Sequence, residues 1–196
     1  MSNVKQYALA IQSVILYKFG SLITGAPNTA DLINSIDITP QVQEIDLFES
    51  IFSPVIRAEI GVIDPINLLV NFPLTGEEAV YISYRNIRDQ KIYKHFMIID
   101  SVSHMAHSDD ARSIAYMLNC VAIESYGNAR QTVQQAYNGT IAQIARKVYD
   151  DHIVARVKKV FPSYPIQQLI VEDNDTQSVT FVCPNIHPFP TIDMLA

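Results

Sequence analysis

Apolar and polar residues alternate along much of the first two-thirds of the chain. From Tyr7 to Tyr17, large apolar residues occupy most of the odd-numbered positions. Residues 56–62 and 80–84 repeat this alternation. A period of two residues is typical of a β-strand with one buried face, so these segments are predicted to be strands.

A long hairpin is predicted in the middle of the chain. Residues 92–105 and 112–123 form its two strands, and the polar residues 107–111 form its turn. A loop is expected earlier, at residues 20–29, because this stretch is rich in Gly, Pro and Asn.

The apolar positions of residues 36–47 change parity partway along the segment. Up to Val42 they are even-numbered, whereas Ile45 and Leu47 are odd-numbered. A β-bulge near residues 43–44 would produce this change, and so would two strands that meet at a corner.

The predicted fold class is β-rich (α+β). The six predicted strands favour a closed or nearly closed antiparallel barrel over an open sheet, because closure removes exposed edge strands. We assign this barrel to residues 1–124. Residues 125–196 are predicted to begin a smaller, mixed α/β domain.

The apolar spacing becomes helical in this second part. In residues 141–148, apolar residues recur at positions i, i+3, i+4 and i+7, and Asn138 or Thr140 is expected as the N-cap. Two short strands are predicted at residues 168–171 and 179–183. The last seven residues read as the start of a further helix.

Composition limits the possible functions. The 196 residues are 48% hydrophobic, with a mean hydropathy of +0.11, so partners are expected to cover some apolar surface. The net charge of -6 and the lack of any basic run argue against a nucleic-acid-binding protein, since such affinity comes mainly from clustered Lys and Arg.

The cysteines and the first residues indicate the compartment. The two cysteines, Cys120 and Cys183, suit a reducing environment and cannot build a disulfide framework or a zinc site. The apolar stretch near the start is too short and too polar for a membrane span, and it lacks a signal-peptide cleavage pattern. We therefore expect a chain that is made and kept in a cytoplasm and that does not bind membranes.

The densest cluster of potential metal ligands is His104, His107, Asp109 and Asp110. Imidazole and carboxylate groups bind divalent metals, so a metal-dependent hydrolase is an alternative hypothesis. However, the cluster falls on the predicted hairpin tip, where Ser and Asp are expected for turn geometry alone. In a regular strand, the two histidines would also point to opposite faces.

Other kinds of chemistry have little support in the sequence. It contains no nucleophile elbow, phosphate-binding loop, dinucleotide-binding fingerprint or paired-cysteine motif, so we expect neither an enzyme nor a cofactor. A monomeric barrel that binds a small molecule or an oligosaccharide remains a further alternative. Its oligomeric state would distinguish it from a structural protein.

Several short motifs occur in a fixed order along the chain. Phe48-Glu49-Ser50-Ile51 comes first, then Asp64-Pro65-Ile66-Asn67-Leu68 and Pro73-Leu74-Thr75-Gly76-Glu77-Glu78, and finally "AYNGTIAQIARKVYDDHI" and "VCPNIHPFPTIDMLA". This ordered set, which extends over most of residues 35–196, resembles the baseplate central-hub protein of contractile-tailed bacteriophages. The hub domain of type VI secretion spikes is related to that family.

The resemblance implies a tail-tube-like β-barrel and a structural function without catalysis. Such hubs form trimeric rings in the tail baseplate of the virion. Their assembly takes place in the host cytoplasm. They contact the tail tube protein, the central spike protein and the baseplate wedge proteins, and DNA passes through the channel without specific binding. Family members continue past the length of this chain, so the resemblance leaves open whether the chain is a fragment of a longer hub or a short variant.

Two loops are the candidate interfaces of such a hub. The residues that we select at the barrel rim are Glu49, Phe52 and Pro54 in the first loop and Phe72, Leu74 and Glu77 in the second. The alternative is that Phe52 and Leu74 only plug the ends of the barrel, as apolar turn residues often do in small barrels.

Overall fold

The computed structural model describes residues 9–18, 35–50, 53–74, 78–87, 90–107, 113–161, 166–172 and 177–195. Contacts divide the chain into two compact units, with the boundary between Ala122 and Ile123. The fold is β-rich α+β, as predicted: a large antiparallel sheet, a second small sheet and a few helices. Tyr7, Phe52, Glu77 and the loop at residues 20–29 lie outside the described residues.

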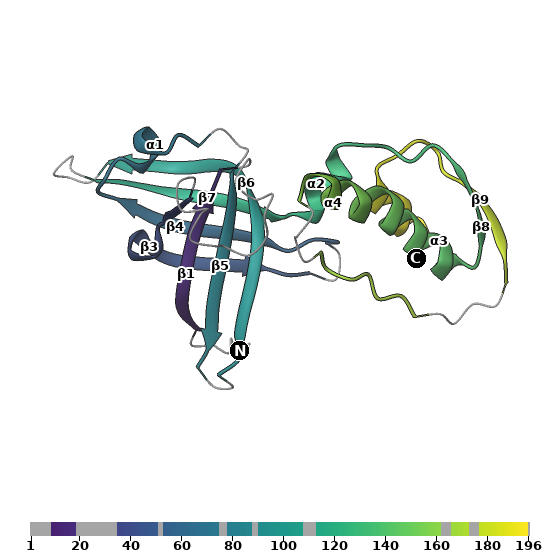
Figure 1. Ribbon diagram of the computed structural model, residues 1–196, viewed down its shortest axis with the longest axis horizontal. Helices are drawn as coiled ribbons and strands as arrows, with labels where there is room; N and C mark the ends of the chain where they lie inside the picture. The colour runs from purple at the N-terminus through teal and green to yellow at the C-terminus, as the bar shows by residue number, and fades with distance from the viewer. Residues whose placement is uncertain are drawn as a thin grey trace, which may run out of the picture. The chain divides into compact units, whose positions relative to one another are not determined.

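The first unit is built on a seven-stranded antiparallel sheet (Figure 1). Its strands are β1 (Leu9–Tyr17), β2 (Ser35–Asp37), β3 (Val42–Phe48), β4 (Arg57–Asp64), β5 (Ala79–Asn86), β6 (Ile92–His107) and β7 (Ile114–Ala122). Their order in the sheet is β2-β1-β5-β6-β7-β4-β3. A short helix, α1 (Leu68–Asn71), lies between β4 and β5 in the chain.

The two strands at the ends of this order, β2 and β3, follow one another in the chain. They are joined by the short 3-10 helix η3 (Thr39–Gln41). Beyond β2, the N–H of Ile38 still donates to the carbonyl of Val14 at 2.9 Å, whereas β3 pairs with β4. One continuous segment therefore borders both β1 and β4, and the sheet curls like a barrel, as the alternation predicted.

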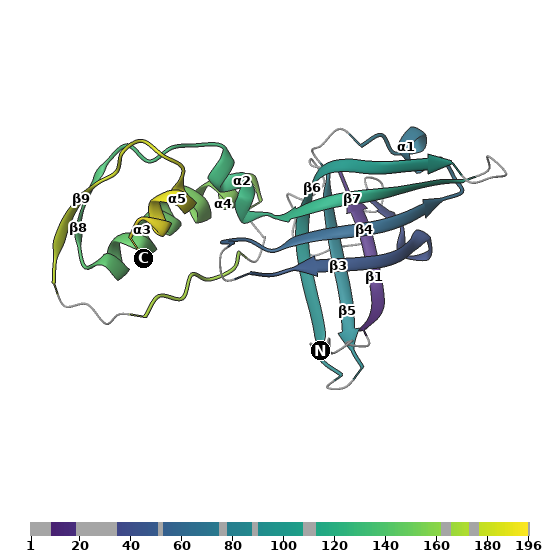
Figure 2. The ribbon, with the colours of Figure 1, turned by 180° about the vertical axis from the view of Figure 1, so that it is seen from behind.

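Strand β6 is the second corner of this sheet. It pairs with β5 through residues 92–98 and with β7 through residues 97–107, and the register shifts at Asp100. A β-bulge of this kind lets a strand pass from one layer to a layer of different strand direction. Accordingly, β1 and β5 run across β3, β4 and β7 (Figures 1 and 2).

The parity change in residues 36–47 has both of the predicted causes. The corner lies at η3, and a register shift between Val42 and Glu44 leaves Gln43 as the extra residue opposite β4. As a result, Ile36, Val42, Ile45 and Leu47 all pack against the same core. The fully buried centre of that core includes Leu16, Ile38, Ile60, Ile82 and Leu118.

The second unit contains a long helical segment and a two-stranded sheet. Its elements are α2 (Glu124–Ala129), β8 (Ala136–Gly139), α3 (Ile141–Val148), the π-helix η4 (Tyr149–Val154), α4 (Ala155–Val160), β9 (Val179–Val182) and α5 (Pro188–Asp193). Strands β8 and β9 pair antiparallel. A separate core of Val133, Tyr137, Ile144, Val148 and Cys183 lies within this unit.

The prediction of a helix at residues 141–148 is confirmed, and Thr140 is its N-cap. The Thr140 hydroxyl accepts from the N–H of Gln143 at 3.3 Å, and the Gln143 side chain accepts from the N–H of Thr140 at 3.1 Å. This reciprocal capping box fixes the first turn. Asn138 instead belongs to β8, which the alternation did not predict.

Two further predictions have different outcomes. The strand expected at residues 179–183 is β9, whereas residues 168–171 pair with no strand in the part of the chain that the structure describes. The last predicted helix is α5, which begins at Pro188. Among the described residues, none of the helices is long and apolar enough to cross a membrane.

Candidate functional site

The second predicted interface loop is fixed to the barrel by a cation. Lys18 Nζ lies 2.7 Å from Oε1 of Glu78, whose side chain is 1% exposed, and it also donates to the carbonyl of Pro73. The same ammonium group lies 4.5 Å from the centre of the Phe72 ring. A buried carboxylate needs such a partner, so this cluster holds the loop against the end of β1.

The selected residues of this loop are partly buried. Phe72 and Leu74 both pack against the barrel core, which agrees with the alternative that such residues plug a barrel end. Leu74 also lines a pocket of about 440 Å³ together with Leu69, Pro73 and the β6 residues around Asp100. Their role in binding partners stays a prediction. Sequence reasoning missed the pairing of Lys18 with Glu78, because nothing local connects residues so far apart.

The preceding motif residues, Asp64 to Leu68, build a turn. The buried carboxylate of Asp64 accepts from the N–H groups of Ile66 at 3.0 Å and Leu68 at 2.5 Å. Asn67 has a φ of 54°, a left-handed conformation that Asn tolerates better than most residues. Leu68 is 1% exposed and enters the core. Asp64, Asn67 and Leu68 therefore have structural functions in this motif.

Glu49 and Pro54, from the first predicted loop, are exposed. The Glu49 carboxylate acts electrostatically on Tyr84 and His95, two side chains that lie on neighbouring strands. These rings are stacked, with centroids 5.6 Å apart, and the Tyr84 hydroxyl lies 3.2 Å from His95 Nε2. Tyr93 also stacks on Tyr84, with ring centroids 5.3 Å apart.

Burial controls the protonation of this aromatic cluster. It lowers the pKa of His95, and the charge of Glu49 opposes that shift. Burial also raises the pKa of Tyr84, with smaller contributions in the same direction from Tyr93 and Glu49. The neutral forms are therefore favoured. Sequence reasoning missed this cluster, because it depends on the β5–β6 register that places Tyr84 opposite Tyr93.

The proposed metal ligands are only partly described. His104 and His107 are exposed, whereas Asp109 and Asp110 lie outside the described residues. His104 has a φ of 55° and lies where the β6–β7 register shifts. The strand is therefore not regular here, and the argument that the two histidines point to opposite faces does not apply. Within the described segments, no cluster of three or more His, Cys, Asp or Glu residues could hold a metal ion.

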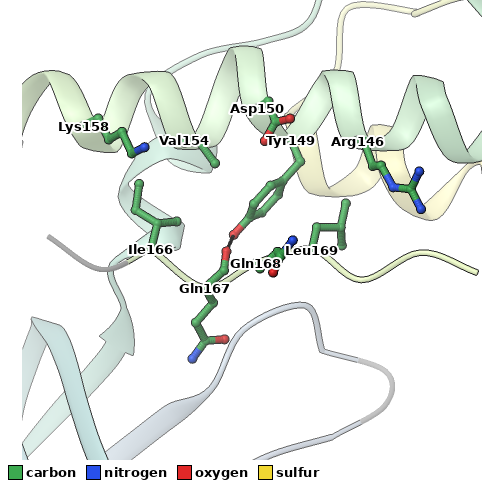
Figure 3. Close-up of a pocket in the computed structure, with 9 residues that line it drawn as sticks. All are labelled: Arg146, Tyr149, Asp150, Val154, Lys158, Ile166, Gln167, Gln168 and Leu169. Carbon is green, nitrogen blue, oxygen red and sulfur yellow. Dashed lines mark hydrogen bonds between the residues drawn. The ribbon is translucent and has the colours of Figure 1, made fainter.

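In the second unit, a pocket of about 390 Å³ lies between the long helical segment and residues 166–169 (Figure 3). Arg146, Asp150 and Lys158 line its helical wall. Tyr149 extends from the same wall, and its hydroxyl donates to the carbonyl of Gln167 at 2.7 Å. The N–H of Gln167 donates to Glu124, so both polar groups of this peptide are fixed.

A second polar cluster surrounds the π-helix. The Tyr137 hydroxyl lies 2.9 Å from His152 Nε2 and accepts from the side chain of Gln135 at 2.5 Å. Gln131 donates to the carbonyl of His152. Burial lowers the pKa of His152, and Asp151 opposes that shift. These contacts position η4 and need no bound ligand.

Comparison with known proteins assigns no family. No protein-family profile matches the chain, and no curated protein matches it. Among solved structures, the chain is similar to the tail protein from Neisseria meningitidis MC58, with 16% sequence identity and a TM-score of 0.41. The match covers 74% of this chain and 34% of that one, so it spans about a third of the other protein's length. A TM-score of this size does not establish a shared fold.

Proposed function

We propose that this chain is a structural component of a phage tail baseplate, a hub that connects the tail tube to the central spike and lines the channel. It functions by shape and association rather than by turnover. The proposed partners are further copies of the chain in a trimeric ring, the tail tube protein, the central spike protein and the wedge proteins. The chain then resides in the virion after assembly in the host cytoplasm.

The main support for the proposal is that the motifs of the hub resemblance build the fold. Asp64, Asn67 and Leu68 form a hydrogen-bonded turn that returns the chain to the barrel core. Thr140 caps α3 through a box closed by Gln143. A resemblance made of scaffold residues supports a common scaffold, and the mechanical function is proposed by analogy at the level of the fold.

The last motif, in residues 182–196, also contains residues that build the fold. Asn185 adopts a left-handed φ of 62°, and its side chain accepts from Gln134 at 2.7 Å. Pro188 opens α5, and Phe189 behind it is 7% exposed. These residues join α5 to the rest of the second unit, so they too determine the fold.

Charge and apolar exposure agree with a channel protein. A net charge of -6 disfavours the retention of DNA phosphates, because such retention depends on basic side chains. Several large apolar side chains are exposed on the first unit, among them Phe48, Val70 and Met105. Assembly would cover such side chains if they belong to one contiguous surface.

The test uses the purified full chain and native particles. Sedimentation velocity is expected to detect an ordered oligomer, and electron microscopy is expected to detect rings. Antibodies against the chain, carrying gold, are expected to label tailed particles at the junction of tube and spike. A chain that stays monomeric at about 50 µM and labels no tail tip contradicts the hub function. That concentration lies well above the dissociation constant of most specific assemblies.

The metal-dependent hydrolase is distinguished by titration with zinc or manganese. The hub proposal expects no metal uptake and an unchanged melting temperature, in both the original chain and His107→Ala. Stoichiometric binding that His107→Ala abolishes supports the hydrolase instead. The small-molecule-binding barrel is distinguished by its monomeric state.

A further inference from the structure

The pocket of about 440 Å³ in the first unit, here called the α1 pocket, is mostly apolar. Its apolar walls come from α1, the loop after it and β6, and they consist of Leu69, Pro73, Leu74, Ile99, Val102 and Met105. Asp100 and Ser101 complete the lining, and both are exposed. The α1 pocket is therefore an apolar hollow that reaches the surface and has one carboxylate in its wall.

Contacts behind the lining hold two of these walls in place. Lys18 donates to the carbonyl of Pro73 and pairs with the buried Glu78. The Asp64 carboxylate holds the turn before α1, and Leu68 of α1 is buried in the core. Walls that are already ordered lose little freedom when an occupant binds, so less of the binding free energy is spent on ordering them.

Two irregularities of β6 coincide with residues of the α1 pocket. The register with β7 shifts at Asp100 and again between Ser103 and Ala106, where His104 has a φ of 55°. Such bulges change the direction of side chains, and both Asp100 and Met105 line the pocket. Met105 is 61% exposed, and an exposed Met is an adaptable apolar contact of the kind that binding surfaces use.

The chemistry of the α1 pocket selects its occupant. An apolar side chain fits the walls, and a Lys or Arg beside that side chain is attracted by Asp100. The other charges near the pocket do not offset Asp100, because Lys18 is neutralised by Glu78 and Asp64 is a further carboxylate. The expected occupant is an apolar side chain with cations, and without carboxylates, beside it.

Ile92 meets this description. Among the exposed large apolar side chains of the described residues, it alone has a Lys or Arg and no carboxylate within two positions in the chain; its neighbours are Lys91 and Lys94. Of the others, Val70, Met105, Val179 and Val182 have no Lys or Arg within that range, and Phe48, Ile63, Ile66, Ile87, Ile170 and Met194 have a carboxylate there.

The β5–β6 register places two cations on the same face as Ile92. Arg85 is opposite Ile92, and Lys94 is two residues further along β6, so the three side chains point to one face of the sheet. Glu49 and Lys91 act on the aromatic cluster, which is on the opposite face. Arg85, Ile92 and Lys94, here called the Ile92 face, are exposed, and the two cations form no ion pair within the described residues.

The α1 pocket and the Ile92 face lie at opposite ends of the first unit. Ile92 is the first residue of β6 after the turn from β5, and this turn is at the other end of the barrel from α1 (Figures 1 and 2). One molecule therefore cannot place its own Ile92 in its own pocket, whereas a second copy can supply it.

We propose that the Ile92 face of one copy docks in the α1 pocket of a second copy, with Ile92 between the apolar walls and Arg85 and Lys94 near Asp100. This docking rests on the self-association in the proposed function and gives it a surface. Because two different patches of the chain meet, the contact is head-to-tail, so repetition closes a ring when the rotation permits. The apolar contact supplies affinity, and the charges select the orientation.

Charge reversal at exposed positions tests the selection. Asp100→Lys is expected to weaken self-association of the full chain by about tenfold at low salt, and so is Arg85→Glu/Lys94→Glu. The triple variant Asp100→Lys/Arg85→Glu/Lys94→Glu reverses both surfaces and is expected to restore association. Sedimentation velocity measures all three. A triple variant that associates no better than the others overturns the docking.

Matched controls separate this contact from a general effect of net charge. Asp46→Lys makes the same change as Asp100→Lys, and Lys147→Glu/Lys159→Glu makes the same change as the double variant of the Ile92 face. All three control positions are exposed and lie outside both surfaces, so the controls leave association unchanged. A control that weakens association as much as its matched variant contradicts the proposal.

The apolar part of the contact has its own test. Ile92→Asn is expected to weaken association by about tenfold or more, whereas Ile92→Val retains it, because the pocket walls are apolar. Ile170→Asn, at a side chain that is 87% exposed in the second unit, is the control and leaves association unchanged. Circular dichroism verifies that the variants fold, as the 53% exposure of Ile92 predicts. Equal effects at the two positions exclude Ile92 from the contact.

Cross-linking identifies the occupant. Ile92→Cys and Met105→Cys chains, treated with a short bismaleimide, are expected to form dimers when mixed but not separately; Cys120 and Cys183 are buried. Dimers within the Ile92→Cys pool alone indicate a two-fold contact and overturn the proposal. Association of the original chain without any cross-link between positions 92 and 105 overturns the docking and leaves the hub function standing. A strictly monomeric chain overturns both.

Discussion

Lys18 and Glu78 form an ion pair in which the two residues are separated by sixty positions in the chain, with Nζ 2.7 Å from Oε1. Glu78 is almost fully buried, whereas Lys18 keeps about a third of its side chain exposed. We expect Lys18→Ala to destabilise the chain by about 2–3 kcal/mol, since it leaves a buried carboxylate without its cation. Urea unfolding at pH 7 measures this change.

A double variant provides the control for this pair. Lys18→Met/Glu78→Leu removes both charges and keeps the volume, so it is expected to be less destabilised than Lys18→Ala. If the double variant loses as much stability as the sum of the single variants, packing of the loop rather than the ion pair is the cause.

The turn at Asp64 gives a second prediction. Asp64→Ala leaves the N–H groups of Ile66 and Leu68 without their acceptor and is expected to cost about 2–3 kcal/mol. At Asn67, where φ is 54°, Gly is expected to be tolerated, whereas Val is expected to cost about 1–2 kcal/mol because of its branched side chain. Urea unfolding of the three variants measures these differences. A tolerated Val excludes the left-handed turn.

Alternation predicted the barrel because each strand has one face on a single core. Where it failed, the structure depends on contacts between distant residues. The helix α2 contains Gly127 in its middle and forms where it packs against η4, so no local pattern indicated it. Residues 168–171 have the composition of a strand but pair with none of the described strands, because pattern alone does not supply a partner.

The candidate sites were harder to predict for the same reason. Loop composition identified Phe72 and Leu74, but burial against the core and the cation of Lys18 are properties of the folded chain. The aromatic cluster of Tyr84, Tyr93 and His95 depends on cross-strand register, and a sequence fixes register only after the hairpin is placed.

Acid is expected to destabilise the chain through His95 and His152. Burial lowers the pKa of both imidazoles, so the unfolded chain binds protons that the folded chain excludes. Their contribution to stability is complete above the ordinary histidine pKa of about 6.5 and decreases as the pH falls below it, toward the lower folded values. Urea unfolding at pH 7.5 and 5.5 measures the loss.

Single variants assign the acid effect to each histidine. His95→Gln and His152→Gln are each expected to reduce the difference in stability between the two pH values, because Gln keeps a polar side chain and does not titrate. His107→Gln, at an exposed position, is the matched control and leaves the difference unchanged. A pH dependence that persists in the double variant His95→Gln/His152→Gln contradicts this explanation.

Gly127 marks the closest approach between α2 and η4. A Cβ added there would lie 3.0 Å from the Cα of Ile153 and 3.1 Å from its carbonyl oxygen, and neither is the movable end of a side chain. Gly127→Ala is therefore expected to destabilise the second unit by about 1–3 kcal/mol, even though Ala is the better helix former. Thermal unfolding measures the change, with Ala129→Ser at the exposed end of α2 as the control. A stabilised Gly127→Ala variant means that α2 and η4 are further apart in solution than the 3.0 Å approach to Ile153 indicates.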